Sequence, residues 1–208
     1  MRSVWRLDAR ASTGQSSRVT ARPPTTRLTL LCAGATRGVR EGRFPDPAEP
    51  LDDGGRAKVR AAAFDRASVD HCFVSPAASA IETAALLGID AAQQPALRDV
   101  DAGDWAGCSM AEIGEEAFTR WLAAPEQGAP GGEPMTAVRE RVGGWLDELE
   151  EGRVLAVTHA AVIRATLAHA LVLPDASVLA IDVAPLTRLI LSRHGRWRLQ
   201  ALVPPREG

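Results

Sequence analysis

Residues 28–36, with the sequence LTLLCAGAT, join a short apolar run to a small turn that contains Gly34, Thr36 and the thiol of Cys32. The apolar run is typical of a buried strand. A buried strand that delivers a glycine-containing loop to a sheet edge is a common way to build a ligand site in an α/β protein. This stretch therefore predicts a ligand site at the end of the first strand.

His159 is the histidine with the clearest functional context. It follows a predicted strand over residues 153–157 and opens a predicted helix over residues 159–171. A helix N-terminus keeps an imidazole neutral, which suits hydrogen bonding to an anion or action as a base. The alternative interpretation is a histidine held only by local hydrogen bonds. His71, His169 and His194 have no comparable motif around them.

The elements that must position these residues alternate between strands and helices. This order predicts an α/β layered domain with a mostly parallel sheet. The expected strands cover residues 27–31, 69–74, 94–97, 153–157, 178–183, 188–192 and 197–203. The expected helices cover residues 52–66, 77–87, 109–116, 118–122, 136–150 and 159–171.

Three helix-start signals accompany this assignment. Asp52 or Asp53 is expected to cap the helix over residues 52–66. Ser75, followed by a proline, is expected to cap the helix over residues 77–87. Thr158 is expected to cap the helix that begins at His159.

Composition and charge indicate a folded domain with a basic N-terminal segment and argue against a nucleic-acid-binding protein. The 208 residues are 46% hydrophobic with a net charge of −2. Residues 1–27 carry six arginines and one aspartate, a net of +5, which leaves −7 for the remainder. A mildly acidic body does not favour a nucleic-acid partner. Residues 1–26 show no periodicity and are predicted to form a disordered tail, whereas residues 27–204 form the predicted domain.

Cysteine usage and hydropathy suggest where the protein works. The three cysteines are widely spaced, without a CxxC pair, so a disulfide framework is not expected. No apolar run approaches the length of a transmembrane helix, so no membrane association is expected. A reduced, cytoplasmic setting is the default expectation.

Five blocks in series resemble the histidine phosphatase superfamily, also called phosphoglycerate mutase-like. The resemblance covers about residues 27–200. Residues 28–36 resemble the family's RHG-x-T loop, and residues 49–57 resemble its PLTxxGxxQA helix start. Residues 73–84 resemble the SSPLxRAxxTA segment, residues 97–107 the LREIDFGxWEG loop, and residues 154–167 the VLVVTHGGVIRALL segment.

The resemblance implies a three-layer αβα sandwich with its pocket at the carboxyl ends of the strands. In the family, the motif His attacks phosphorus, two Arg side chains hold the phosphate, a second His hydrogen-bonds it, and a loop carboxylate exchanges protons. A phosphomonoester dianion needs guanidinium partners, its transfer needs a nucleophile that leaves again, and the leaving alkoxide needs an acid.

Only part of that machinery matches this chain. The matching positions imply the loop residues Gly34 and Thr36, the proton-transfer residue Asp99 and the second histidine His159. The motif Arg position is Cys32, the nucleophile position is Ala33 and the second Arg position is Ser79. The resemblance therefore implies a degenerate pocket that lacks the nucleophile and both guanidiniums.

The departures favour a pseudophosphatase that binds a small phosphorylated or anionic metabolite, or a partner. Losing a covalent nucleophile costs many decades of rate. The alternatives are a phosphomonoesterase with weak or altered activity, and an acid–base enzyme that uses Asp99 and His159.

Two further hypotheses concern new pocket chemistry. Cys32 could be a thiolate nucleophile if His159 and the helix N-terminus lower its pKa; the blander interpretation is a small buried residue. Arg37, after Thr36, could restore positive charge to the pocket, although an exposed loop arginine is the simpler expectation. Cys32, Asp99 and His159 lack the spacing of a zinc motif, so neither a metal nor a cofactor is expected.

Overall fold

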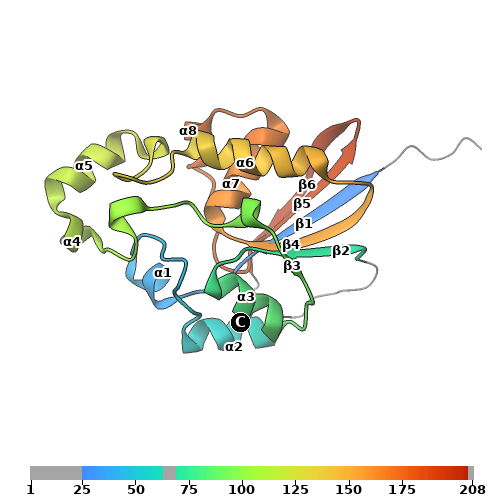
Figure 1. Cartoon of the computed structure of the whole chain (residues 1–208), viewed down its shortest axis with the longest axis horizontal. Coiled ribbons are helices and arrows are strands. Elements are labelled where there is room, and N and C mark those ends of the chain that lie inside the picture. The colour runs from blue at the N-terminus through green and yellow to red at the C-terminus, as the bar shows by residue number, and fades with distance from the viewer. Residues whose placement is uncertain (1–24, 63–68, 206–208) are drawn as a thin grey trace, which may run out of the picture.

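The computed structural model describes residues 25–62 and 69–205, and they build one mixed sheet flanked by helices (Figure 1). In chain order the elements are β1 (Thr26–Cys32), α1 (Arg37–Glu41), α2 (Asp53–Ala61), β2 (His71–Val74), α3 (Ala78–Leu86), β3 (Ala92–Gln93), η1 (Pro95–Leu97), η2 (Gly103–Trp105), α4 (Met110–Ile113), α5 (Glu115–Ala123), η3 (Pro125–Gln127), α6 (Met135–Glu148), β4 (Gly152–Thr158), α7 (Ala160–Leu171), α8 (Asp175–Val178), β5 (Arg188–His194) and β6 (Arg196–Val203).

The described strands lie in the order β3-β2-β4-β1-β5-β6. The first four are parallel to one another, β5 runs antiparallel to β1, and β6 runs antiparallel to β5. β1 and β4 lie in the centre, and their apolar runs are buried because helices cover both faces of the sheet. The expected α/β architecture with a mostly parallel sheet is confirmed.

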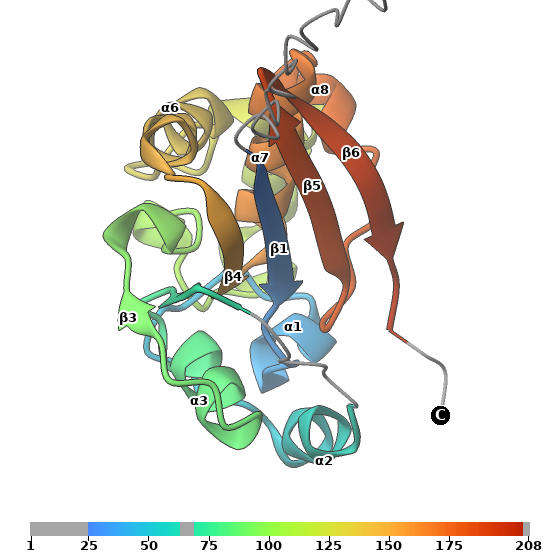
Figure 2. The ribbon, with the colours of Figure 1, turned by 90° about the vertical axis from the view of Figure 1, so that its right-hand side faces the viewer.

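Two helical layers cover the sheet. α6 and α7 lie on one face, where Val138, Val142 and Leu146 pack against β1, β4 and β5 in the larger apolar core. α3 lies on the other face and packs Ala80 and Ala84 against β2 and β4. The sheet thus separates α6, α7 and α8 from α1, α2 and α3, and Figures 1 and 2 show these two sides.

Several predicted boundaries hold closely. β1 begins at Thr26, one residue inside the predicted tail; residues 1–24 of that tail lie outside the described residues. Asp52 caps α2, accepting a hydrogen bond from the Gly55 N–H. The predicted continuation of α2 to residue 66 falls largely on residues 63–68, which also lie outside the description.

Three predictions of local structure are wrong. Residues 178–183 do not form a strand: α8 ends at Val178, and the following turn donates the Ile181 N–H to the Val178 carbonyl. The strand expected over residues 94–97 is displaced, because β3 is Ala92–Gln93 and the next residues form η1.

The third error concerns two helix caps. Ala77, not Ser75, occupies the N-cap position of α3, and no side chain caps it. Thr158 is the last residue of β4, where its hydroxyl donates to the Leu97 carbonyl, and His159 is the N-cap of α7. Neither hydroxyl therefore has the expected capping role: the Thr158 hydroxyl is bound to the Leu97 carbonyl, and the Ser75 Oγ contacts His159.

No helix among the described residues combines the length and the apolar character that crossing a membrane requires.

Candidate active site

The strand register brings three parts of the chain to one edge of the sheet. Cys32 at the end of β1 lies opposite Thr158 in β4, and Val74 at the end of β2 lies opposite Val157. The residues that follow these positions therefore emerge side by side at the carboxyl ends of parallel strands, the usual place for a site in such a sheet.

His159 is the centre of this group. Its Nε2 lies 2.8 Å from the Ser75 Oγ, and its Nδ1 lies 3.4 Å from the Asp99 Oδ2. His159 is buried, whereas the Asp99 side chain keeps 21% of its surface exposed. The structure thus brings together the histidine and the carboxylate that the sequence singled out.

Ser75 joins them although sequence reasoning assigned it only a capping role. Its backbone N–H donates to the Val157 carbonyl, which fixes the residue beside β4, and it has no exposed surface. The signal that could have identified it is its position: it directly follows a predicted strand, as His159 does, and the structure pairs these two strands.

A salt-bridge network holds the loop that carries Asp99. Arg141 on α6 donates to the carbonyl oxygens of Ala96 (2.7 Å) and Asp99 (3.0 Å) and binds both carboxylate oxygens of Glu133. Burial raises the pKa of Glu133, but the guanidiniums of Arg141 and Arg98 outweigh it, so the pKa lies below its ordinary value. Glu133 is therefore a charged anchor beneath the Asp99 loop.

The loop after β1 already uses its polar groups within the protein. The Ala33 N–H donates to the Thr158 carbonyl, the Gly34 N–H to the Thr83 Oγ1, and the Thr36 Oγ1 accepts from the Val39 N–H. The side chain of Ala33 belongs to the apolar cluster on the α3 face of the sheet. The expected loop is thus present, and the N–H groups of Ala33 and Gly34 are both engaged within the protein.

Gly34 is required there for packing rather than for an unusual backbone conformation. A Cβ on it would stand 2.7 Å from a Val59 methyl and 3.0 Å from a Leu51 methyl. The loop can approach α2 this closely only because residue 34 lacks a side chain.

Cys32 does not have the lowered pKa that the thiolate hypothesis required. Burial, and secondarily the negative charge of Asp99, raise the pKa of its thiol to about 12. The nearby Arg164 acts in the opposite direction but does not compensate; its Nε donates to the Ile181 carbonyl at 2.9 Å. Cys32 is therefore a small, protonated core residue.

Arg37 does not supply a pocket cation. Its side chain is 80% exposed, and its Nε pairs with Glu41 at 2.6 Å. The N–H of Gly38, the next residue, donates to the carboxylate of Glu49 at 2.8 Å. A carboxylate of the chain itself therefore binds the N-terminal end of α1. Arg37 is thus the exposed loop arginine that was the simpler expectation, and the alternative hypothesis of a restored pocket charge is not supported.

Ser79 is buried on α3, one turn before Thr83. The Thr83 hydroxyl donates to the Ser79 carbonyl and accepts from the Gly34 N–H, so Ser79 lies on the helix that holds the loop. A serine at this position contributes no positive charge.

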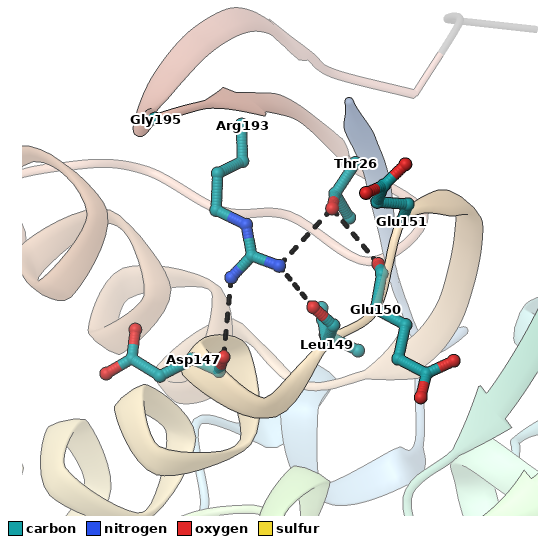
Figure 3. Close-up of a pocket in the computed structure, with 7 residues that line it drawn as sticks. All are labelled: Thr26, Asp147, Leu149, Glu150, Glu151, Arg193 and Gly195. Carbon is teal, nitrogen blue, oxygen red and sulfur yellow. Dashed lines mark hydrogen bonds between the residues drawn. The ribbon is translucent and has the colours of Figure 1, made fainter. Parts of the chain in front are cut away.

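Within residues 25–62 and 69–205, no three His, Cys, Asp or Glu side chains gather as a metal site would require. A cavity of about 710 Å³ lies at the other end of β1, beside Thr26 (Figure 3). There Arg193 donates to the Asp147 and Leu149 carbonyls near the end of α6. These bonds give Arg193 a structural role, because they tie β5 to the end of α6. This cavity is separate from the group around His159.

Comparison with known proteins identifies the family that this architecture belongs to. Residues 28–203 match the family model described as histidine phosphatase superfamily (branch 1). The chain is 32% identical over 166 residues to bifunctional protein Rv2228c of Mycobacterium tuberculosis (strain ATCC 25618 / H37Rv), covering 73% of this chain and 46% of that protein. This chain therefore spans about half the length of that relative.

Two further similarities are to proteins named as phosphatases. Phosphoserine phosphatase 1 of Hydrogenobacter thermophilus (strain DSM 6534 / IAM 12695 / TK-6) is 29% identical over 139 residues, covering 60% of this chain and 66% of that protein. The structure of a mycobacterial glucosyl-3-phosphoglycerate phosphatase matches with a TM-score of 0.75 and 26% identity, covering 88% of this chain and 100% of that one. The chain belongs to the histidine phosphatase superfamily.

Proposed function

We propose that this chain is a pseudophosphatase, a family member that does not form a phosphohistidine. The observation that carries the proposal is Ala33 at the nucleophile position, with its methyl group in an apolar cluster beside the retained His159. A methyl group cannot attack phosphorus, and His159 has Asp99 and Ser75 as its partners.

The electrostatics support the same conclusion. A phosphate dianion is recognised best by bidentate guanidiniums, and both expected positions hold neutral residues, Cys32 and Ser79. Asp99 adds a negative charge beside the site, and Arg37 lies in an exposed pair elsewhere. With no guanidinium at either motif position, the site is poorly suited to a phosphate dianion.

The ligand that we propose is a small anionic metabolite that carries fewer charges than a phosphate dianion. His159, the first turn of α7 and the Gly34–Thr36 loop are the groups that would receive it. Because the Gly34 N–H already donates to the Thr83 Oγ1, we expect weak binding. A protein partner is the alternative occupant of the same edge.

The test is phosphate release from a broad panel of phosphomonoesters. The natural chain and its His159→Ala variant should release phosphate at the same background rate. A triple variant with Ala33→His, Cys32→Arg and Ser79→Arg should gain turnover if its unfolding temperature shows that it folds. Turnover by the natural chain that His159→Ala abolishes would refute the proposal.

Anion binding is tested by thermal unfolding in the presence of acetate, phosphate or sulfate. A ligand that binds the folded chain raises the unfolding temperature with its concentration. We expect a rise with monoanions that His159→Ala removes. An equal rise in both proteins would indicate a general salt effect and would contradict binding at His159.

A further inference from the structure

The contacts of His159 have the connectivity of a nucleophile–base–acid relay. The Ser75 Oγ lies 2.8 Å from Nε2, and the Asp99 Oδ2 lies 3.4 Å from Nδ1 on the opposite side of the ring. We infer that Ser75, His159 and Asp99 transfer the acyl group of a small neutral carboxylic ester to water. This activity goes beyond the proposed loss of phosphoryl transfer and does not depend on anion binding.

The contacts around the ring favour the reactive arrangement. A carboxylate beside Nδ1 favours the tautomer that carries its proton there, which leaves the lone pair of Nε2 toward Ser75. The Ala77 N–H donates to the Ser75 Oγ at 3.3 Å. Since that bond uses a lone pair of the hydroxyl oxygen, the hydroxyl proton can point at Nε2, where a general base must receive it.

The charges of the site do not obstruct a neutral substrate. Cys32 is protonated and Ser79 is uncharged, while Asp99 is the carboxylate beside the imidazole. A neutral ester needs no guanidinium clamp, so the residues that make the site unsuitable for a phosphate dianion do not obstruct an ester. Ser75 has no exposed surface and both Ala33 and Ser79 are buried, so an ester must displace local packing to reach the hydroxyl, which favours a compact substrate.

The reaction balances without a cofactor. The Ser75 Oγ forms a bond to the carbonyl carbon while Nε2 accepts the hydroxyl proton. The bond from that carbon to the alkoxy oxygen then breaks, and Nε2 returns the proton to the leaving alcohol. Water attacks the acyl-serine with His159 again as base, which releases the carboxylic acid and restores the hydroxyl.

Backbone groups are available for the developing oxyanion. The N–H of Ala78, near the nucleophile, is not one of them, because it already donates to the Pro47 carbonyl. The first turn of α7, immediately after His159, contains N–H groups that have no acceptor within the helix, and His159 does not cap them with its side chain. These donors are our candidates for oxyanion stabilisation.

The experiment measures hydrolysis of p-nitrophenyl acetate by the full chain, together with peptide mapping of the acetylated protein after a rapid quench. We expect transient acetylation of Ser75 and a rate that Ser75→Ala lowers at least ~100-fold. Ser177→Ala, which changes an exposed serine of α8, is the matched control and should retain the natural rate. Ser75→Cys keeps a nucleophile and should still become acetylated.

Acetylation confined to Lys58 or the cysteines, or a rate that Ser75→Ala leaves unchanged, would overturn the inference. Mapping on the natural chain gives this answer even if Ser75→Ala fails to fold. Phosphate release is measured in parallel. Phosphatase activity with no acyl-serine would refute both proposals, whereas absence of both activities would refute the relay and leave the pseudophosphatase proposal standing.

Discussion

The contacts that Arg141 makes with Glu133 and with the Asp99 loop allow a quantitative test of how the site is held in place. Replacing Arg141 with Met keeps much of the aliphatic stem but removes the guanidinium. Glu133 then loses its two-point partner, and the carbonyl oxygens of Ala96 and Asp99 lose their donors. Arg98, whose side chain is 46% exposed, remains as the other cation on Glu133.

Removing one partner of a buried ion pair costs about 3–5 kcal/mol. Because Arg98 still faces Glu133, we expect Arg141→Met to fall at the lower end, with the free energy of unfolding reduced by about 3 kcal/mol. For a domain of this size, that corresponds to an unfolding temperature lowered by about 6–12 °C. The assay is thermal and urea unfolding at neutral pH.

The pH dependence supplies a second readout. The pKa of Glu133 is lower in the folded chain than its ordinary value. The stability that it contributes is therefore complete above the ordinary glutamate range and is lost as pH falls through the folded pKa. Arg141→Met should flatten this acid-side decline, and adding Glu133→Gln should recover part of the lost stability.

Arg37→Met is the matched control, since that guanidinium is mostly exposed in its pair with Glu41. It should leave the unfolding temperature unchanged, because exposed pairs contribute little. The reasoning is refuted if Arg141→Met and Arg37→Met unfold at the same temperature, or if adding Glu133→Gln to Arg141→Met destabilises the chain further.

Two other results are expected. With a pKa of about 12, the Cys32 thiol should resist iodoacetamide at pH 8 in the folded chain, while the partly exposed Cys108 reacts. Equal rates for the two thiols in the native protein would contradict the burial of Cys32. The stability gained by keeping Cys32 protonated should fade as pH rises from about 9 toward 12. Gly55→Ala should lower the unfolding temperature, because its Cβ would stand 2.1 Å from the Ala35 carbonyl oxygen. Gly54→Ala should be tolerated, because its close contact is with the flexible end of the Arg40 side chain at 2.7 Å and the Asp52 Oδ1 lies at an ordinary 3.4 Å. Equal effects of the two substitutions would show that the loop moves freely.

Sequence reasoning succeeded where local pattern and fold agree. The central strands and the amphipathic α6 have periodicities that tertiary packing reinforces. It failed at residues 178–183, where apolar residues suggested a strand. There the backbone closes a turn after α8, and the Ile181 carbonyl accepts from Arg164, a contact that local propensity does not encode.

The candidate site also contains residues that sequence patterns identified and one that only the tertiary structure reveals. The family motifs identified His159 and Asp99, and the structure places them 3.4 Å apart. Ser75 was missed because a serine before a proline is a strong local cap signal. Its hydroxyl instead contacts a histidine 84 positions away in the chain, a pairing that the strand order creates.

Cys32 and Arg37 show why a side chain's chemical type does not establish its role. A cysteine at a strand end can be a thiolate only where positive charge outweighs burial, and here burial and Asp99 act together against ionisation. An arginine near a pocket contributes charge only if its guanidinium faces inward, and Glu41 holds Arg37 on the surface.

The most direct test of the central claim is a search for the phosphohistidine itself. The natural chain would be incubated with a reactive phosphate donor, quenched in alkali, which preserves phosphohistidine, and weighed intact by mass spectrometry. The account predicts no phosphoryl adduct on the natural chain and an adduct on the Ala33→His, Cys32→Arg, Ser79→Arg variant. An adduct on a histidine of the natural chain, lost in His159→Ala, would contradict it.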